Sequence, residues 1–124
     1  MNEDGKNTVV LGASDDPERY AHKALKRLME NGHPVLPVNP KLSTLEGLPV
    51  YRELSEIREP VDTVTVYLSP ARSTPLADQF VSLSPKRVIL NPGAENPDLE
   101  RALDAAGIPW MHACTLVLLA TGRY

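Results

Sequence analysis

The feature that most constrains the fold is a regular alternation of short apolar runs with longer segments of helical periodicity. Apolar runs, most of them rich in β-branched residues, occupy residues 8–12, 35–38, 63–68, 87–90 and 108–112. Helical spacing of apolar residues is found over residues 19–30, from about residue 75, and from Pro97 to just before Gly107. Such alternation gives a parallel sheet with helices on both faces. We therefore predict an α/β fold: one doubly wound, Rossmann-like domain with a five-stranded, mostly parallel sheet.

Length and composition agree with a single domain spanning residues 1–124. The chain has 124 residues, of which 42% are hydrophobic, and this is enough to bury one core without disulfides or metals. Residues 1–6 are polar and are expected to form a flexible tail, unlike a secretory signal. The single cysteine cannot form an internal disulfide, so a reducing cytoplasm is the expected compartment.

Charge and hydropathy limit the partners that this chain is expected to have. The net charge of −3 gives no overall basic field, so nucleic acid is not an expected partner. The longest apolar run, residues 116–120, is far too short to span a bilayer, so no membrane association is expected. A small anion held by local geometry remains compatible with both observations.

Local signals also predict where the helices begin, end and bury their side chains. Asp16 is placed to cap the first helix, with Pro17 at its first position and Asn31-Gly32 at its end. A short helix is expected near residues 54–57. The residues expected on buried helix faces are Ala21, Ala24, Leu25, Leu28 and Met29, then Leu76, Phe80 and Leu83, and finally Leu99, Ala102, Leu103 and Ala106.

Small residues, proline or asparagine follow each of the five predicted strands. The segments are Gly12-Ala13-Ser14, Asn39-Pro40-Lys41, Ser69-Pro70, Asn91-Pro92-Gly93-Ala94 and Ala113-Cys114-Thr115. For any one loop, the needs of a turn explain this composition. The carboxyl ends of parallel strands, however, lie at one edge of the sheet, and ligands bind there where the strand order reverses. Taken together, the five loops favour a ligand site at that edge.

The end of the second predicted strand discriminates best between classes of ligand. Proteins that bind NAD usually place a carboxylate there for the ribose hydroxyls, whereas this chain has Asn39, Pro40 and Lys41. A cation at this point suits a nucleotide with an additional phosphate, which leaves NADP and coenzyme A. Gly12 is followed by Asp15, Asp16 and Pro17 rather than by two further glycines, and this counts against NADP.

At this point the sequence resembles the small single-domain CoA-binding proteins, which are similar to the nucleotide-binding domain of the succinyl-CoA synthetase α subunit. The resemblance covers nearly the whole chain. It is carried by Gly12-Ala13-Ser14, Asp16-Pro17, Arg19-Tyr20, Lys23-Ala24, Pro37-Val38-Asn39-Pro40, Val61-Asp62, residues 91–96 and residues 114–119. The synthetase domain that carries the phosphorylated histidine has no counterpart in these residues, so the resemblance does not imply ligase activity.

The resemblance implies coenzyme A or an acyl-CoA as ligand and suggests a place for each of its parts. The implied phosphate site is Gly12, Ala13 and Ser14, with Arg19, Tyr20 and Lys23 on the following helix; Asp16 would cap that helix and pair with Arg19. Val38, Asn39, Pro40 and Lys41 would hold the ribose end, where Lys41 meets the 3′-phosphate or the adjacent pyrophosphate. Leu68, Ser69 and Pro70 would face the adenine, and Arg72 would stack on the base or reach a phosphate. Asn91 and Gly93 would line the pantetheine arm.

Two classes of function stay open on the sequence. The first is non-catalytic binding of CoA or an acyl-CoA by a carrier, sensor or regulator. The second is an NADP- or CoA-dependent enzyme component whose catalytic residues come from a partner. No catalytic set is recognisable, which favours the first class. His22, His33 and His112 lack metal-ligand spacing, so no metal is expected either.

Two features near the C-terminus leave alternatives open. Cys114 is expected to be a small buried residue, with a reactive position facing a bound thiol as the alternative. The apolar run that follows it is expected to turn back onto the last helix of the domain, with weak self-association as the alternative. The chain is accordingly expected to be a monomer or a weak homodimer.

Overall fold

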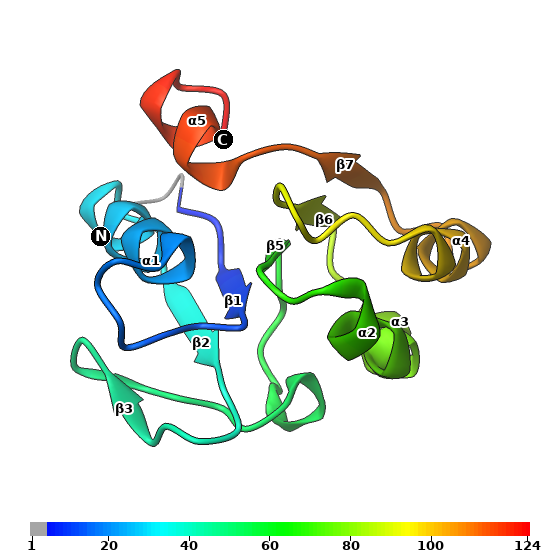
Figure 1. Ribbon diagram of the computed structural model, residues 1–124, viewed down its shortest axis with the longest axis horizontal. Coiled ribbons are helices and arrows are strands. Elements are labelled where there is room, and N and C mark those ends of the chain that lie inside the picture. The colour runs from blue at the N-terminus through cyan, green and yellow to red at the C-terminus, as the bar shows by residue number, and fades with distance from the viewer. Residues whose placement is uncertain (1–4) are drawn as a thin grey trace.

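The computed structural model describes residues 5–124 and contains one five-stranded parallel sheet (Figure 1). Its strands lie in the order β2-β1-β5-β6-β7. Their bounds are β1 (Thr8–Leu11), β2 (Val35–Val38), β5 (Thr63–Val66), β6 (Arg87–Leu90) and β7 (Trp110–His112). The α/β fold with a parallel sheet is therefore confirmed.

Helices follow or connect these strands. They are α1 (Tyr20–Glu30), α2 (Pro70–Ser73), α3 (Ala77–Leu83), α4 (Pro97–Ala105) and α5 (Thr115–Ala120), with 3₁₀ turns η1 (Leu54–Glu56) and η2 (Thr74–Leu76). A small hairpin, β3 (Thr44–Leu45) and β4 (Leu48–Pro49), lies beside β2. Residues 1–4 of the predicted tail lie outside the described residues. Lys6, from the same predicted tail, donates its backbone N–H to Nδ1 of His33 at 3.0 Å.

The strand order places the point of reversal between β1 and β5. Thr8 pairs with Val35 of β2 on one side and with Thr63 of β5 on the other. The chain therefore leaves β1 for β2 in one direction and returns to β5 in the opposite direction. In sheets of this type the crevice for a ligand opens beyond the carboxyl ends of those two central strands.

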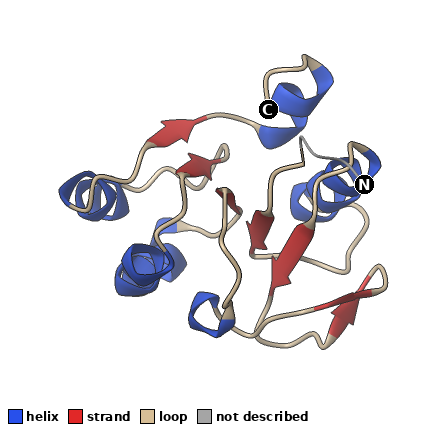
Figure 2. Ribbon diagram, turned by 180° about the vertical axis from the view of Figure 1, so that it is seen from behind, coloured by secondary structure: helices blue, strands red, loops and turns tan. Residues whose placement is uncertain are grey.

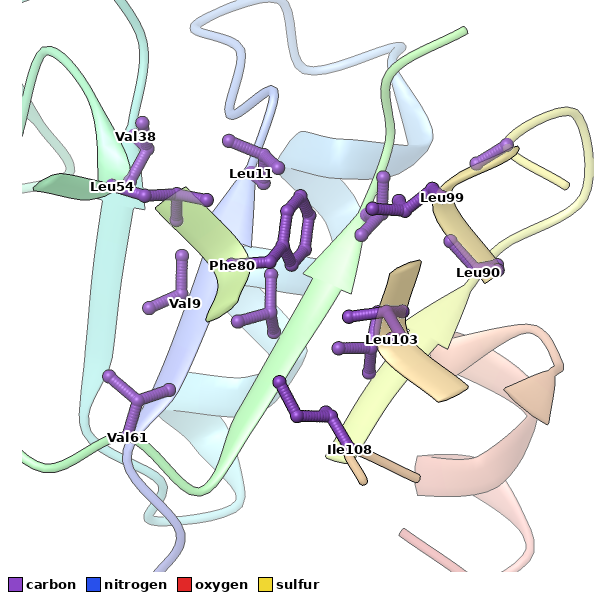
Figure 3. Close-up of a cluster of buried hydrophobic side chains, with 14 of the residues drawn as sticks. Val9, Leu11, Val38, Leu54, Val61, Phe80, Leu90, Leu99, Leu103 and Ile108 are labelled. Atoms are coloured by element: carbon purple, nitrogen blue, oxygen red, sulfur yellow. The ribbon is translucent and has the colours of Figure 1, made fainter. Parts of the chain in front are cut away.

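Alternate side chains of the strands point into two separate hydrophobic clusters. Val9 and Leu11 belong to the larger cluster, where Phe80 of α3 is fully buried among strand and α4 side chains (Figure 3). Val10 points to the opposite face and packs with Leu25 of α1. Helices α3 and α4 thus cover one face, and α1 and α5 cover the other (Figures 1 and 2). Burial on both faces explains why the strands are apolar throughout.

The end of α1 was predicted correctly, but its beginning was not. The N–H groups of Gly32 and His33 donate back to Met29 and Leu28, and Gly32 has the positive φ of +81° that this ending requires. At the other end, Asp16 caps a turn that precedes the helix: its Oδ1 accepts from the N–H of Glu18. Because that turn occupies residues 16–19, α1 begins only at Tyr20, without a side-chain cap. Met29, which was expected on the buried face, is exposed.

Further expectations need correction. Strand β5 ends at Val66 rather than at residue 68, and helical structure begins at Pro70 rather than near residue 75, because Pro70 stands at the first position of α2. The last apolar segment forms α5, which packs on α1 and not on α4, with Leu119 against the cluster that contains Val10. The β3–β4 hairpin was missed because its strands have only two residues each.

Candidate functional site

A cleft of about 880 Å³ opens at the carboxyl edge of β1, β2 and β5, where the strand order reverses. Its volume is within the range of sites for small molecules and cofactors. The predicted site residues that line it are Gly12, Ala13, Ser14, Arg19, Tyr20, Val38, Asn39, Pro40, Lys41, Leu68 and Arg72. The structure thus brings together the loops after β1, β2 and β5 around one space.

The loop after β1 is held against β2 by two backbone hydrogen bonds. The N–H groups of Gly12 and Ala13 donate to the carbonyl oxygen of Val38, at 3.2 Å and 3.1 Å. These two N–H groups are therefore already occupied within the protein. They are not free to bind the phosphate that the resemblance implies for this loop. Within residues 5–124, the N–H groups of Ser14, Asp15 and Tyr20 have no hydrogen-bond partner. All three residues line the cleft, so the donors for an anion lie slightly further along the chain.

Asn39 joins the loop after β1 to the loop after β2. Its Nδ2 donates to the carbonyl oxygen of Ala13 at 2.7 Å, and its Oδ1 accepts from the N–H of Lys41 at 2.7 Å. Both ends of the amide are thus engaged within the protein. At the position where NAD-binding proteins carry a carboxylate for the ribose, this chain has a residue that fixes the shape of two loops.

His22 fixes the same loop from the side of α1. It is buried, its Nδ1 donates to the carbonyl oxygen of Ser14 at 2.8 Å, and its Nε2 lies 3.5 Å from Oε2 of Glu46 in the β3–β4 turn. Since His22 does not line the cleft, its effect on a ligand would act through the position of Ser14.

Of the positively charged side chains that line the cleft, one forms an ion pair and the others do not within residues 5–124. Arg19 lies 3.9 Å from Asp16, as expected, but both side chains are largely exposed and the pair is weak. Among the residues that the structure describes, Lys41, Arg52 and Arg72 have no acidic partner. Four cations line the cleft (Arg19, Lys41, Arg52 and Arg72) together with three carboxylates (Asp15, Asp16 and Glu53). In a chain with a net charge of −3, this small positive excess at the cleft favours an anionic ligand.

The remaining predicted site residues do not line the cleft: Lys23, Ser69, Pro70, Asn91 and Gly93. Lys23 lies at a second cleft, between α1 and α5, and Ser69 and Pro70 begin α2. Asn91 is buried; its Nδ2 donates to Thr65 Oγ1 at 2.7 Å and its Oδ1 accepts from the N–H of Thr115 at 2.9 Å. Its side chain therefore ties β5 to the start of α5.

Several lining residues were missed by sequence reasoning. They are Leu11, Asp15, Asp16, Ala21, Arg52, Glu53, Leu54, Tyr67, Leu76, Gln79 and Pro92. Arg52, Glu53 and Gln79 come from segments that are not predicted strand ends. Arg52 is brought in because Tyr51 forms a parallel bridge with Val38, and no local pattern announces that pairing.

Other chemistry is limited in the described part of the chain. Neither a histidine nor a cysteine lines the cleft, and no group of three histidine, cysteine, aspartate or glutamate side chains is arranged to hold a metal ion in residues 5–124. Cys114 is half-buried at the N-cap of α5. Over the same residues, no helix combines the length and apolar character needed to cross a membrane.

The fold and the cleft define a class: a parallel α/β domain with a cleft of small-molecule size where the strand order reverses. Comparison with known proteins gives the family. The model of the CoA binding domain family matches residues 6–120, and the chain belongs to that family.

Individual relatives agree with this assignment. The chain is 32% identical over 76 residues to the uncharacterized protein YneT of Bacillus subtilis, covering 61% of this chain and 56% of that protein. It is 32% identical over 62 residues to the α subunit of an ADP-forming acetate–CoA ligase of Pyrococcus furiosus, covering 49% of this chain and 14% of the subunit. The matched part of this chain thus spans about half of the first relative and a small part of the second.

Solved structures share the whole architecture. A crystal structure of an uncharacterized protein has a TM-score of 0.90 at 42% identity and covers 97% of this chain and 98% of its own. A Thermus thermophilus protein has a TM-score of 0.89 at 34% identity, covering 97% of this chain and 91% of that one. An acetyl-coenzyme A synthetase of Ca. Korarchaeum cryptofilum, at 23% identity and a TM-score of 0.75, covers 86% of this chain and 25% of its own; this likeness concerns the fold alone.

Proposed function

We propose that this protein binds coenzyme A, or an acyl-CoA, in the cleft at the carboxyl edge of the sheet and acts as a cytoplasmic carrier, sensor or regulator. The observation that carries the proposal is a set of cleft cations that have no ion-pair partner within residues 5–124, namely Lys41, Arg52 and Arg72, in a chain that belongs to the CoA binding domain family. Coenzyme A has a diphosphate and a separate 3′-phosphate, so it requires cations at more than one place.

The residues available fit the parts of this ligand. The unpaired N–H groups of Ser14, Asp15 and Tyr20 suit the diphosphate, because they lie at or near the N-terminus of α1. Lys41, held through Asn39 at the end of β2, suits the 3′-phosphate. Leu68 and Leu76 offer apolar surface to the adenine or to the pantetheine arm.

A thermal-shift panel tests the ligand. Ligands that bind only the folded state raise the melting temperature by an amount that increases with their affinity and concentration. Coenzyme A and acetyl-CoA are expected to raise it, and NAD and FMN to have no effect at the same concentration. A larger shift with NAD, NADPH or FMN, and none with coenzyme A, would contradict the proposal.

Calorimetry with a matched pair of variants then tests the site. Lys41→Gln is expected to weaken coenzyme A binding by about tenfold, because a charge-assisted contact contributes roughly 1.5 kcal/mol or more. Lys86→Gln is the control, since Lys86 is exposed and does not line the cleft. Equal affinities for the two variants would place the charged end of the ligand elsewhere.

A second candidate function is a CoA-dependent enzyme component that a partner completes. It is favoured by the local match to a ligase α subunit, of which this chain covers only 14%. The absence of histidine and cysteine from the lining of the cleft, within the described residues, favours simple binding. Chromatographic analysis of acetyl-CoA incubated with the protein tests catalysis by the chain itself, and released coenzyme A would contradict simple binding. An enzyme component that a partner completes would instead leave the thioester unchanged until the partner is added.

A further inference from the structure

Arg52 reaches the candidate site through a pairing that extends the sheet beyond β2. Tyr51 forms a parallel bridge with Val38; its N–H donates to the carbonyl oxygen of Pro37 and its carbonyl accepts from the N–H of Asn39, both at 2.9 Å. The bridge places Arg52 beside Asn39 in register. Arg52 therefore leaves the sheet at the same carboxyl edge as the loop that carries Lys41, and both residues line the cleft.

The backbone around Arg52 is fixed on both sides. Its N–H donates to Oε1 of Glu56 at 2.6 Å, and the hydroxyl of Tyr51 donates to Oε1 of Glu59 at 2.8 Å. Two residues further on, Leu54 is buried in the larger hydrophobic cluster. A side chain that starts from a fixed backbone loses less freedom when it binds a ligand.

The guanidinium of Arg52 is available for a ligand. Within residues 5–124 it forms no ion pair, and the neighbouring carboxylates are already engaged. Glu56 accepts from the backbone N–H of Arg52, and Glu53 accepts from Nε2 of Gln79 at 3.3 Å. A planar guanidinium donates two parallel hydrogen bonds to a phosphate, which a lysine ammonium cannot do.

We propose that Arg52 and Lys41 together bind the 3′-phosphomonoester of the ligand, and that Arg52 determines the preference for coenzyme A over dephospho-CoA. This inference rests on the proposed function. Lys41 follows the end of β2, and Arg52 extends from the strand segment paired with that end, so one phosphate at this corner of the cleft meets both cations. A phosphomonoester carries up to two negative charges near neutral pH, which two cations match.

The test measures binding of coenzyme A and dephospho-CoA by calorimetry to the wild-type chain and to Arg52→Gln, Arg52→Lys and Arg58→Gln. Arg58 is the control because it is exposed in the same connection and does not line the cleft. Arg52→Gln is expected to weaken coenzyme A by about tenfold or more and dephospho-CoA by less than about twofold. Arg52→Lys should recover only part of the loss, and Arg58→Gln should match the wild type for both ligands.

The outcomes separate the two proposals. A wild-type chain that binds neither ligand would overturn the proposed function itself. The role of Arg52 alone would be overturned if the wild-type chain binds coenzyme A but Arg52→Gln weakens the binding of both ligands equally. It would also be overturned if Arg52→Gln weakens the binding of neither ligand. Circular dichroism spectra that coincide for all variants are required before the affinities are compared.

Discussion

Gly12 lies where the loop after β1 passes close to the end of β5, and two constraints act on it. Its φ is +89°, which side chains rarely adopt, and a Cβ there would lie 2.9 Å from Cδ2 of Leu68 and 3.2 Å from the backbone of Tyr67. The glycine is thus required by the fold, whatever the ligand needs. A ligand-binding test based on Gly12→Val would be confounded, because the variant is strained before any ligand is added.

We expect Gly12→Ala to lower the free energy of unfolding by about 2–4 kcal/mol, from backbone strain plus overpacking. Gly107→Ala is the control: its φ is +73°, but nothing lies within 4 Å of the added Cβ. Gly107→Ala should lower the free energy of unfolding by about 1–2 kcal/mol, from backbone strain alone. Urea unfolding measures both variants. Equal losses would show that the close approach to Tyr67 and Leu68 contributes nothing.

At the scale of single residues, Tyr67 makes the free energy of unfolding depend on pH. Burial raises the pKa of its phenol to about 12, and the nearby hydroxyls of Thr65 and Thr115 offset the rise only in part. Within residues 5–124, the phenol oxygen is buried without a hydrogen-bond partner. Because the unfolded chain loses this proton near pH 10 and the folded chain only near pH 12, the neutral phenol's contribution is complete below pH 10 and is lost as the pH rises toward 12.

Stability is therefore expected to fall between pH 10 and pH 12, by at most about 3 kcal/mol from Tyr67. Tyr67→Phe should reduce the slope, while the raised pKa of Tyr124 leaves part of it. Tyr20→Phe is the matched control, since Tyr20 is 68% exposed. Urea unfolding from pH 9 to pH 11 measures the slopes. The interpretation fails if both variants keep the wild-type slope.

At the scale of elements, α4 and α2 are joined through the residue that caps α4. Oδ1 of Asn96 accepts from the N–H groups of Asp98 and Leu99, and Nδ2 donates to the hydroxyls of Ser73 and Thr74, both at 2.8 Å. Asn96 is buried, so the hydrogen bonds of its side-chain amide are shielded from water. One side chain thereby caps the N-terminus of α4 and docks this helix on α2.

Asn96→Ala is expected to lower the free energy of unfolding by about 2–4 kcal/mol, from the lost cap and the unpartnered hydroxyl of Ser73. Asp98→Ala changes the same helical turn but removes only an exposed ion pair with Arg101, and should cost less than about 1 kcal/mol. Thermal and urea unfolding should rank the two variants in this order. A smaller loss for Asn96→Ala than for Asp98→Ala would contradict the docking role.

At the scale of the whole molecule, α5 covers the face of the sheet that α1 leaves open. Leu119 and Tyr124 pack against the cluster that contains Val10, while Val117 is 57% exposed on the outer side. Leu119 therefore has an intramolecular partner, and Leu116 and Leu118 are half-buried. We infer that this segment does not require a second subunit.

We accordingly expect a monomer of 13.6 kDa by light scattering, both for the wild-type chain and for Val117→Asp. The substitution adds a charge to a surface that is already solvated, so folding should be unaffected. Self-association would be shown by a wild-type dimer that Val117→Asp converts into a folded monomer. Circular dichroism provides the check on folding.

The sequence by itself determined most of the strands of the main sheet and the ends of two helices. Burial on both faces makes the strands apolar, so β1, β2 and β6 could be located within a residue of their ends. The ends of α1 and α4 followed from Gly32 and Gly107, because a helix ending of this kind requires a positive φ. These signals are local, and local backbone preferences act in the same way wherever the segment lies in the fold.

Tertiary structure alone decided the rest of the lining of the cleft. The loops after β1, β2 and β5 do meet as predicted, but Arg52 reaches the cleft through the bridge between Tyr51 and Val38, and Asn91 turns instead toward Thr65 and Thr115. Likewise α5 packs on α1 although α4 precedes it in the chain. Contacts between distant segments depend on strand order and register, which residues set jointly across the sheet, and no single stretch of sequence contains that information.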